Sequence, residues 1–352
     1  MSQTLIIGAG ITGAALAYQL HRRGQTVSIV STHAEGGLAS AASFGWLNAS
    51  YFLSRPHFHL RHQGLAAHRR LTAQLAGLPT SWPGCVWYEA TGDAQAETAA
   101  DLRELGYTVE TLSKARIAAR LPALGPVPET ALHFPEEGVA DPATLARALI
   151  AASGTTVIRA TVQALTSDRG RATGVLTDLG PLTADRVILA SGTGTPALLQ
   201  PFGFALPMLK RPGLMLKTNA LPPICPVVLA TPDQEVRQDA EGHLHAPASA
   251  GHQRDHAESL GAFPVVLNAT LQRLRALFPG QQIHFGRQAM ALRPVPGDGL
   301  PVVGQGPVPG LWLAVMHSGA TLAPVVAELL VDEIVGGDEC PLLADFRPAR
   351  FQ

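Results

Sequence analysis

The sequence "TLIIGAGITGAALAYQLHRRGQTVSIVS", residues 4–31, is the strongest indication of the fold of this chain. Residues 4–7 are a short apolar run that favours a strand, and residues 11–23 repeat apolar side chains at helical spacing before Gly24 ends the pattern. A second apolar strand is expected at residues 27–30. This order predicts a βαβ unit, which takes about 30 residues.

Three glycines lie between the first strand and the helix, spaced as G-x-G-x-x-G at Gly8, Gly10 and Gly13. The first glycine permits a tight turn, the second lets the backbone approach a pyrophosphate, and the third packs the helix onto the strand. The start of the helix adds amide donors and a partial positive charge. We therefore predict a dinucleotide site at this turn.

The second strand ends at Ser31, where a dinucleotide site usually has an acidic residue that binds the adenosine ribose. Ser31 or Thr32 can form hydrogen bonds with a ribose, but without the charge-assisted strength of a carboxylate. Glu35 is an alternative partner. We expect the cofactor to be held less tightly by about 1 kcal/mol, the size of one weakened hydrogen bond.

Length and composition indicate an α/β protein with two domains. The chain has 352 residues, a formal net charge of −1 and a hydrophobic fraction of 46%. No long run of Lys and Arg is present, so nucleic acid is not expected as a partner. The three cysteines are far apart and suit a reducing cytoplasm, and the sequence predicts neither a leader peptide nor a membrane span.

Further elements follow along the chain. A helix is expected over residues 56–78 and another after Asp141, which is a plausible N-cap followed by Pro142. The last helix repeats apolar residues from Leu322 to Ile334 and is expected to end at Gly336.

Several segments resemble the FAD-dependent family of glycine oxidase, sarcosine oxidase and D-amino-acid oxidase. They are the glycine turn, "GGLASAASFGWLNA", "ILASGTGT", "LRPVPGDGLPVVG" and "HSGATLAP", in the order that the family has them. Residues 85–135 and 205–285 resemble the family only loosely. NADP tolerates the loss of the acid after the second strand and is the rival cofactor, but it leaves the C-terminal segments unexplained.

The resemblance implies a Rossmann-like FAD-binding domain with an inserted mixed-sheet substrate domain. The first would comprise residues 1–84, 136–204 and 286–352, and the second residues 85–135 and 205–285. The family sometimes attaches its flavin through a cysteine before the last helix or a histidine after the tryptophan of the first loop. This chain has Met316-His317-Ser318 and Trp46-Leu47 at those places, which implies non-covalent FAD.

The resemblance also implies which residues contact FAD. They are Gly8, Gly10, Ile11, Thr12, Gly13, Ser31, Thr32, Ala39, Ser40, Ser43, Phe44, Gly45, Trp46, Val162, Gly192, Gly319, Ala320, Thr321 and Leu322. The amides of residues 319–321 would begin a helix that points at the flavin, where negative charge develops on reduction. An ordinary helix start capped by Ser318 is the alternative.

Arg293 and His317 are the candidate catalytic residues. Arg293 lies in an "L-R-P" that resembles the glycine oxidase segment whose arginine binds the substrate carboxylate, and a guanidinium suits a carboxylate because it donates two parallel hydrogen bonds. An ion pair between domains is the alternative. His317 is expected either to touch substrate or flavin or to bind backbone.

Other residues are weaker candidates. Asn48 and His245 are assigned to the substrate wall, while Trp46 is as readily a core residue. The pairs His57-x-His59 and His243-x-His245 would each face one side of a strand. No carboxylate or cysteine has the companion spacing, so we predict no metal site.

The resemblance implies oxidation of an amine or amino acid to an imine, by hydride transfer to flavin N5. The expected partners are a small amine or amino-acid substrate and an electron acceptor, either O2 or another molecule. Two alternatives are a FAD-dependent 2-hydroxy-acid dehydrogenase and a flavin-binding module that acts on a macromolecular substrate.

Overall fold

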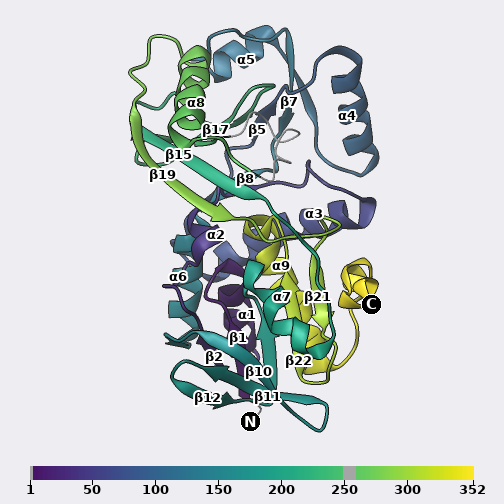
Figure 1. Ribbon diagram of the computed structural model, residues 1–352. Coiled ribbons are helices and arrows are strands. Elements are labelled where there is room, and N and C mark those ends of the chain that lie inside the picture. Colours follow the sequence, from purple (N-terminus) through teal and green to yellow (C-terminus); the bar gives the residue numbers. More distant parts are fainter. Residues whose placement is uncertain (1–2, 249–258) are drawn as a thin grey trace.

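The computed structural model describes residues 3–248 and 259–352. Two lobes lie one above the other, each built on its own main sheet (Figure 1). The N-terminus lies at the far end of the lower lobe. None of the described helices combines the length and apolar character that crossing a bilayer requires.

The lower lobe contains a six-stranded sheet in the order β21-β22-β13-β1-β2-β9. All neighbouring pairs are parallel except β21 and β22, which are antiparallel. The strands are β1 (Gln3–Ile7), β2 (Thr26–Val30), β9 (Thr156–Ile158), β13 (Arg186–Leu189), β21 (Val302–Gln305) and β22 (Leu311–Val315).

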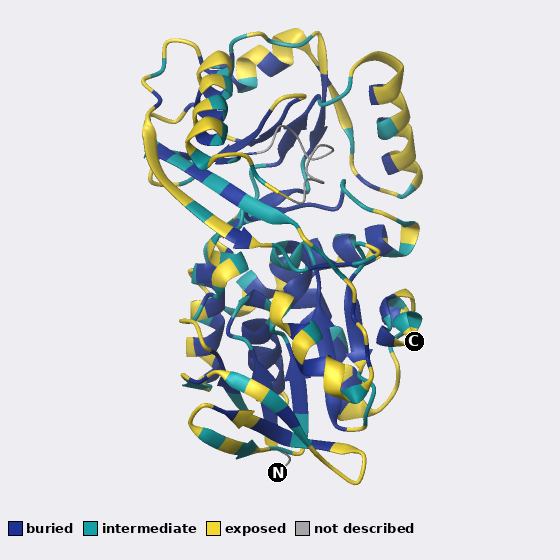
Figure 2. Ribbon diagram, viewed as in Figure 1, coloured by how far each residue is buried: buried dark blue, intermediate teal, exposed yellow. Residues whose placement is uncertain are grey.

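Both faces of this sheet are covered, which is why its strands are mainly apolar. In β1, Ile6 packs against the helices on one face, whereas Leu5 and Ile7 pack against the β-meander on the other. Figure 2 shows these strands buried between the two layers. The helices are α1 (Ile11–Arg22), α3 (Arg55–Gln74), α6 (Pro142–Ser153) and α9 (Gly319–Gly336), and the meander is β10 (Val162–Asp168), β11 (Arg171–Thr177) and β12 (Gly180–Thr183).

The upper lobe contains an eight-stranded sheet in the order β19-β15-β18-β17-β16-β5-β7-β6. It is mixed, because β16 and β5 are parallel while their neighbours are antiparallel. The strands are β5 (Cys85–Trp87), β6 (Glu110–Ser113), β7 (Thr130–Phe134), β15 (Pro212–Ala220), β16 (Val228–Ala230), β17 (Glu235–Gln238), β18 (His243–Pro247) and β19 (Phe285–Leu292). Its helices are α4 (Gly92–Glu104), α5 (Lys114–Arg120) and α8 (Phe263–Leu277).

Short elements connect the lobes. One small sheet pairs β3 (Trp46–Leu47) and β4 (Thr80–Ser81) with β8 (Gly138–Ala140), and another pairs β14 (Met208–Leu209) with β20 (Val295–Pro296). The remaining helical turns are α2 (Leu38–Ala41), η1 (Gly192–Gly194), α7 (Thr195–Leu199), η2 (Gln200–Phe202), η4 (Pro341–Phe346) and η5 (Pro348–Phe351).

The expected α/β architecture with a second, mixed sheet is confirmed. Asp141 is the N-cap of α6, and its side chain accepts hydrogen bonds from the amides of residues 143 and 144. The last helix ends at Gly336 as expected, and the left-handed residue that caps it is the next one, Gly337, with φ 90°. The domain boundary expected at residue 286 falls inside β19, which remains paired with β15 as far as Leu292.

Candidate active site

A cavity of about 710 Å³ lies where the two lobes meet. From the lower lobe it is lined by residues 7–12, 30–33, 37–40, 42–46, 190–194 and 314–320. From the upper lobe it is lined by residues 212–215 and 291–293 together with Glu235 and Pro247. Most of the residues expected to contact a cofactor therefore line one cavity.

The glycine turn shapes one end of this cavity. Gly8 has φ 111°, and a Cβ there would lie 2.5 Å from the carbonyl oxygen of Ala190. A Cβ at Gly13 would lie 2.0 Å from the carbonyl oxygen of Gly8. Gly13 does not line the cavity itself, and its role is to let α1 pack against the turn. Gly10 is the N-cap of α1 and does line the cavity.

Ser31 lies in the cavity wall at the end of β2, next to Thr32. The Ser31 hydroxyl donates a hydrogen bond of 2.9 Å to the carbonyl oxygen of His33. Its oxygen lone pairs can still accept from a ligand hydroxyl. Glu35, the alternative ribose partner, is not among the described residues that line the cavity.

The loop after β2 is fixed by hydrogen bonds from both lobes. Ser40 Oγ accepts from the amide of Ile11 at 3.1 Å, and Ser43 Oγ accepts from the amide of Gly45 at 3.0 Å. From the upper lobe, Arg237 donates through Nε to the carbonyl oxygen of Phe44. The hydroxyls of this loop therefore bind the loop and α1, which sets the wall of the cavity.

The first turn of α9 forms another part of the wall. Gly319 and Ala320 line the cavity, while Thr321 and Leu322 are buried behind them. Thr321 Oγ1 donates to the carbonyl oxygen of Trp46 and accepts from the amide of Asn48, both at 3.3 Å. Ser318 has φ 57° and makes no side-chain capping bond, so it is not an ordinary helix cap.

Arg293 and His317 both line the cavity. The Arg293 guanidinium lies along Gly213 and makes contacts of 3.4 Å from Nε to the carbonyl oxygen of Arg211 and from Nη2 to that of Pro212. His317 Nδ1 lies 3.3 Å from the Ser318 hydroxyl. The candidate carboxylate-binding residue therefore enters from the upper lobe, and the histidine from the start of α9.

Sequence reasoning missed Arg61, which lines the cavity and is 3% exposed. Arg61 donates from Nε to the carbonyl oxygen of Asn48 at 3.2 Å and from Nη2 to Asn48 Oδ1. Burial is the main cause that lowers the pKa of Arg61 to about 10, so it remains a cation at neutral pH. The signal in the sequence is a basic residue on the buried face of α3, four residues after His57.

Two buried glutamates were also missed. Glu235 lines the cavity from β17. Glu137 lies behind Trp46 and accepts from Trp46 Nε1 at 2.8 Å, Ser50 Oγ at 2.6 Å and the Tyr107 hydroxyl at 3.1 Å. Burial outweighs these hydrogen bonds and raises the pKa of Glu137 to about 7.

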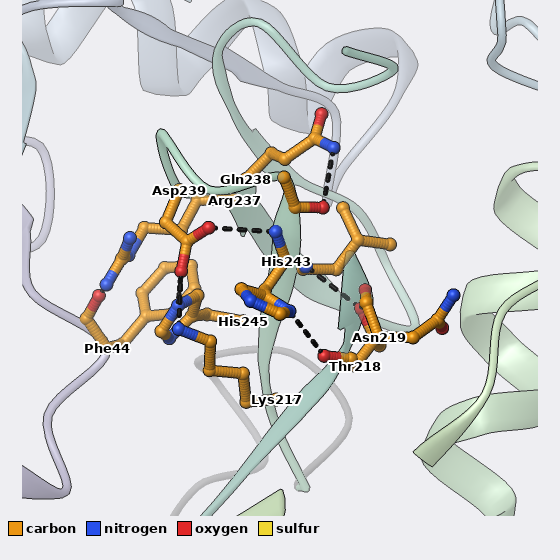
Figure 3. Close-up of polar contacts among 11 residues, drawn as sticks. Phe44, Lys217, Thr218, Asn219, Arg237, Gln238, Asp239, His243 and His245 are labelled. Carbon is orange, nitrogen blue, oxygen red and sulfur yellow. Dashed lines mark hydrogen bonds and ion pairs between the residues drawn. The ribbon is translucent and has the colours of Figure 1, made fainter. Parts of the chain in front are cut away.

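His245 does not belong to the described wall of this cavity. It lies on β18, and its Nε2 is 2.8 Å from Asp239 Oδ2, which also binds Lys217 Nζ at 2.7 Å (Figure 3). The contact with Asp239 thus holds the imidazole outside the described lining of this cavity, although we expected it in the substrate wall. His57 and His59 lie in α3 and not on a strand. No group of three potential metal ligands occurs within the described ranges.

The βαβ unit with its glycine turn and the cavity beside it define a dinucleotide-binding protein, in which a second lobe lies over the cofactor cavity. The model of the DAO family, FAD dependent oxidoreductase, matches residues 3–333. The chain therefore belongs to this family, and its cofactor is FAD.

Individual relatives are similar over nearly the whole chain. Glycine oxidase of Pseudomonas putida is 25% identical, with 96% of this chain and 95% of that protein covered. D-amino acid dehydrogenase of Methylobacterium nodulans is 29% identical, with 95% of both covered. The structure of glycine oxidase from Geobacillus kaustophilus has the same fold, with a TM-score of 0.88, 24% identity and 99% of both chains covered.

Other relatives are longer than this chain. The bifunctional ThiO/ThiG proteins of Trichormus variabilis and of a Nostoc species are each 27% identical and match 99% of this chain. The chain spans 55% of their length.

The residues of the cavity fit FAD. Gly10 leaves the start of α1 open on the cavity side, where amides and the helix dipole suit a pyrophosphate. Ser31 and Thr32 lie where the ribose would be expected, and the start of α9 lies beside the start of α1, since a Cβ at Gly319 would be 3.6 Å from Thr12 Oγ1. One continuous wall thus carries donors for both ends of an extended cofactor.

Proposed function

We propose that this protein uses non-covalent FAD to oxidise the carbon that bears the nitrogen of an amine or amino acid. The product is an imine, which hydrolyses in water. Bound FAD supplies the two-electron oxidation. The relatives named glycine oxidase and D-amino acid dehydrogenase support this reaction class.

The observation that carries the proposal is the position of Arg293 in the same cavity as the glycine turn and the start of α9. Arg293 binds the substrate carboxylate through its guanidinium and so orients the reacting carbon. Phe44, Trp46 and Met215, which also line the cavity, exclude water around the substrate.

Arg61 fixes the pocket wall in this proposal. It is a buried cation whose two hydrogen bonds hold Asn48 in place, so Asn48 presents a fixed surface to the substrate. A substrate that enters as the neutral amine needs no protein base. His317 lies at the start of α9, where it contacts the substrate or the flavin.

Anaerobic titration of the purified holoprotein tests this proposal. The visible spectrum is recorded while glycine, sarcosine, D- and L-amino acids, N-carboxyalkyl amino acids and 2-hydroxy acids are added. Bleaching by an amine and not by the matching hydroxy acid supports amine oxidation. Bleaching by hydroxy acids alone contradicts it and favours the dehydrogenase alternative.

The electron acceptor is tested in the same cuvette. Readmission of air reoxidises the flavin at once if O2 is the acceptor. A flavin that stays reduced in air and is reoxidised by an added quinone or dye indicates a dehydrogenase.

A further inference from the structure

The first turn of α9 contains a carbonyl group that the helix itself cannot satisfy. In an α-helix the carbonyl of Ala320 would accept from the amide of residue 324. That residue is Pro324, which lies inside α9, has no amide hydrogen and has a ring that crowds the carbonyl four residues earlier. The Ala320 carbonyl therefore needs a donor from outside the helix.

His68 of α3 supplies that donor. Its Nε2 lies 2.7 Å from the carbonyl oxygen of Ala320, and the whole residue is buried. Because a carbonyl only accepts, Nε2 carries the proton. No described group bonds to Nδ1, so a second proton there would be buried without an acceptor. The side chain is therefore the neutral imidazole, in agreement with a pKa that burial lowers to about 4.

The same face of α3 contacts the next residue of α9. Gly64 precedes His68 by one helical turn, and a Cβ at Gly64 would lie 2.7 Å from the carbonyl oxygen of Thr321. On its other side, Thr321 is bonded to Trp46 and Asn48. The turn that carries Ala320 into the cavity wall is thus held between α3 and β3.

We propose that His68 is a positioning residue, which fixes the first turn of α9 toward the flavin by donating the hydrogen bond that Pro324 removes from the helix. This inference rests on the proposed place of the flavin at that turn and not on the identity of the substrate. The amides of the turn stabilise negative charge on the reduced cofactor only if the turn keeps its direction.

Substitutions at both partners test the pairing. His68→Leu removes the donor, whereas His68→Gln keeps one at a similar distance from the backbone. Pro324→Ala restores an amide to the helix. We expect His68→Leu to weaken FAD binding about tenfold, equivalent to about 1.4 kcal/mol, and to lower the flavin midpoint potential. Both His68→Gln and the double variant His68→Leu/Pro324→Ala should recover the affinity to within about twofold and restore the potential.

His59→Leu is the matched control, since His59 is an exposed histidine of the same helix. It should keep the wild-type affinity for FAD and the wild-type flavin potential.

The proposal is wrong if His68→Leu keeps the wild-type affinity and potential, or if the double variant binds FAD as weakly as His68→Leu. If His68→Leu does not fold, recovery of folded, FAD-binding protein in the double variant supports the pairing, and failure of the double variant to fold overturns it. Amine-dependent bleaching of the wild-type protein is measured separately, so failure of the proposed reaction is distinguishable from failure of this inference.

Discussion

Among single residues, Ser31 is proposed to bind the adenosine ribose of FAD through a hydroxyl, where dinucleotide sites usually have a carboxylate. Ser31 Oγ already donates to the carbonyl oxygen of His33, so it is oriented to accept from a ribose hydroxyl. We expect Ser31→Ala to weaken FAD binding about fivefold, the effect of one neutral hydrogen bond of about 1 kcal/mol. Equilibrium titration with FAD measures it, with the exposed Ser167→Ala as the control. An unchanged dissociation constant would show that Ser31 does not bind the ribose.

In the proposed function, substrate recognition depends on Arg293. A charged hydrogen-bonded contact contributes about 1.5–3 kcal/mol, so Arg293→Ala should raise KM for a carboxylate substrate at least about tenfold. Arg293→Lys should raise KM less than Arg293→Ala does, because lysine keeps the charge but not the bidentate hydrogen bonding of the guanidinium. Arg287→Ala, at an exposed position of β19, is the matched control. Equal losses for an amino acid and its decarboxylated amine would argue against carboxylate recognition.

The glycine turn was predicted from its local spacing, whereas the residues after β2 were expected from the family resemblance; most of both sets line the cavity. Arg61 and Glu235 were not predicted, because each reaches the cavity through tertiary packing of a distant element. The sequence does contain a signal for Arg61. His57, Arg61 and His68 share the buried face of α3, and polar residues on the face of a helix that should be apolar indicate a site. Sequence does not reveal that Asp239 binds His245.

At the scale of elements, the close packing of α3 against α9 needs a glycine at position 64. Gly64→Ala places a methyl group against the Thr321 carbonyl, so the helices must separate. We expect a loss of about 1–3 kcal/mol in the free energy of unfolding, together with weaker FAD binding. Denaturant unfolding and FAD titration measure the two effects.

Gly336→Ala is the control for this substitution. Gly336 is the last residue of α9, and no heavy atom lies within 4 Å of a Cβ placed there among the described residues. The control should be neutral or slightly stabilising, because alanine is the better helix former. If both alanine variants behave alike, the contact between α3 and α9 does not determine the position of the turn.

The elements with strong periodicity were predicted well. The βαβ unit and α9 agree with expectation to within one or two residues at each end. For the upper sheet, only its mixed character was predicted and not its strand order. Strands that are neighbours in this sheet come from distant parts of the chain. The parallel pairing of β16 with β5 depends on long-range contacts that short strands do not encode locally.

At the scale of the whole molecule, Glu137 joins the two lobes. Its carboxylate accepts hydrogen bonds from Trp46 of β3 and from Ser50, and also from Tyr107 of the upper lobe. Burial raises its pKa to about 7 from an ordinary value of 4.5. The folded state therefore binds the proton more tightly, and this residue contributes a stability that is present below pH 4.5 and lost as pH rises to 7.

The contribution amounts to about 3 kcal/mol over that window. The free energy of unfolding of wild type minus that of Glu137→Gln should therefore fall by about this amount between pH 5 and pH 8. Wild type is compared with Glu137→Gln because other groups also change the free energy of unfolding with pH. Burial lowers the pKa of His57 to about 3, so His57 makes the free energy of unfolding rise with pH, which is the opposite direction. Parallel pH profiles for the two proteins would mean that Glu137 is ionised throughout the range.

Amine oxidation by this protein is tested by anaerobic stopped-flow reduction of the FAD-loaded protein with an amino acid that carries hydrogen or deuterium on its α-carbon. We predict that the flavin absorbance is bleached, that the deuterated substrate reacts more slowly, and that the Arg293→Ala variant needs a higher substrate concentration for the same rate. A flavin that remains oxidised with every amine and amino acid tested would show that this protein does not oxidise them.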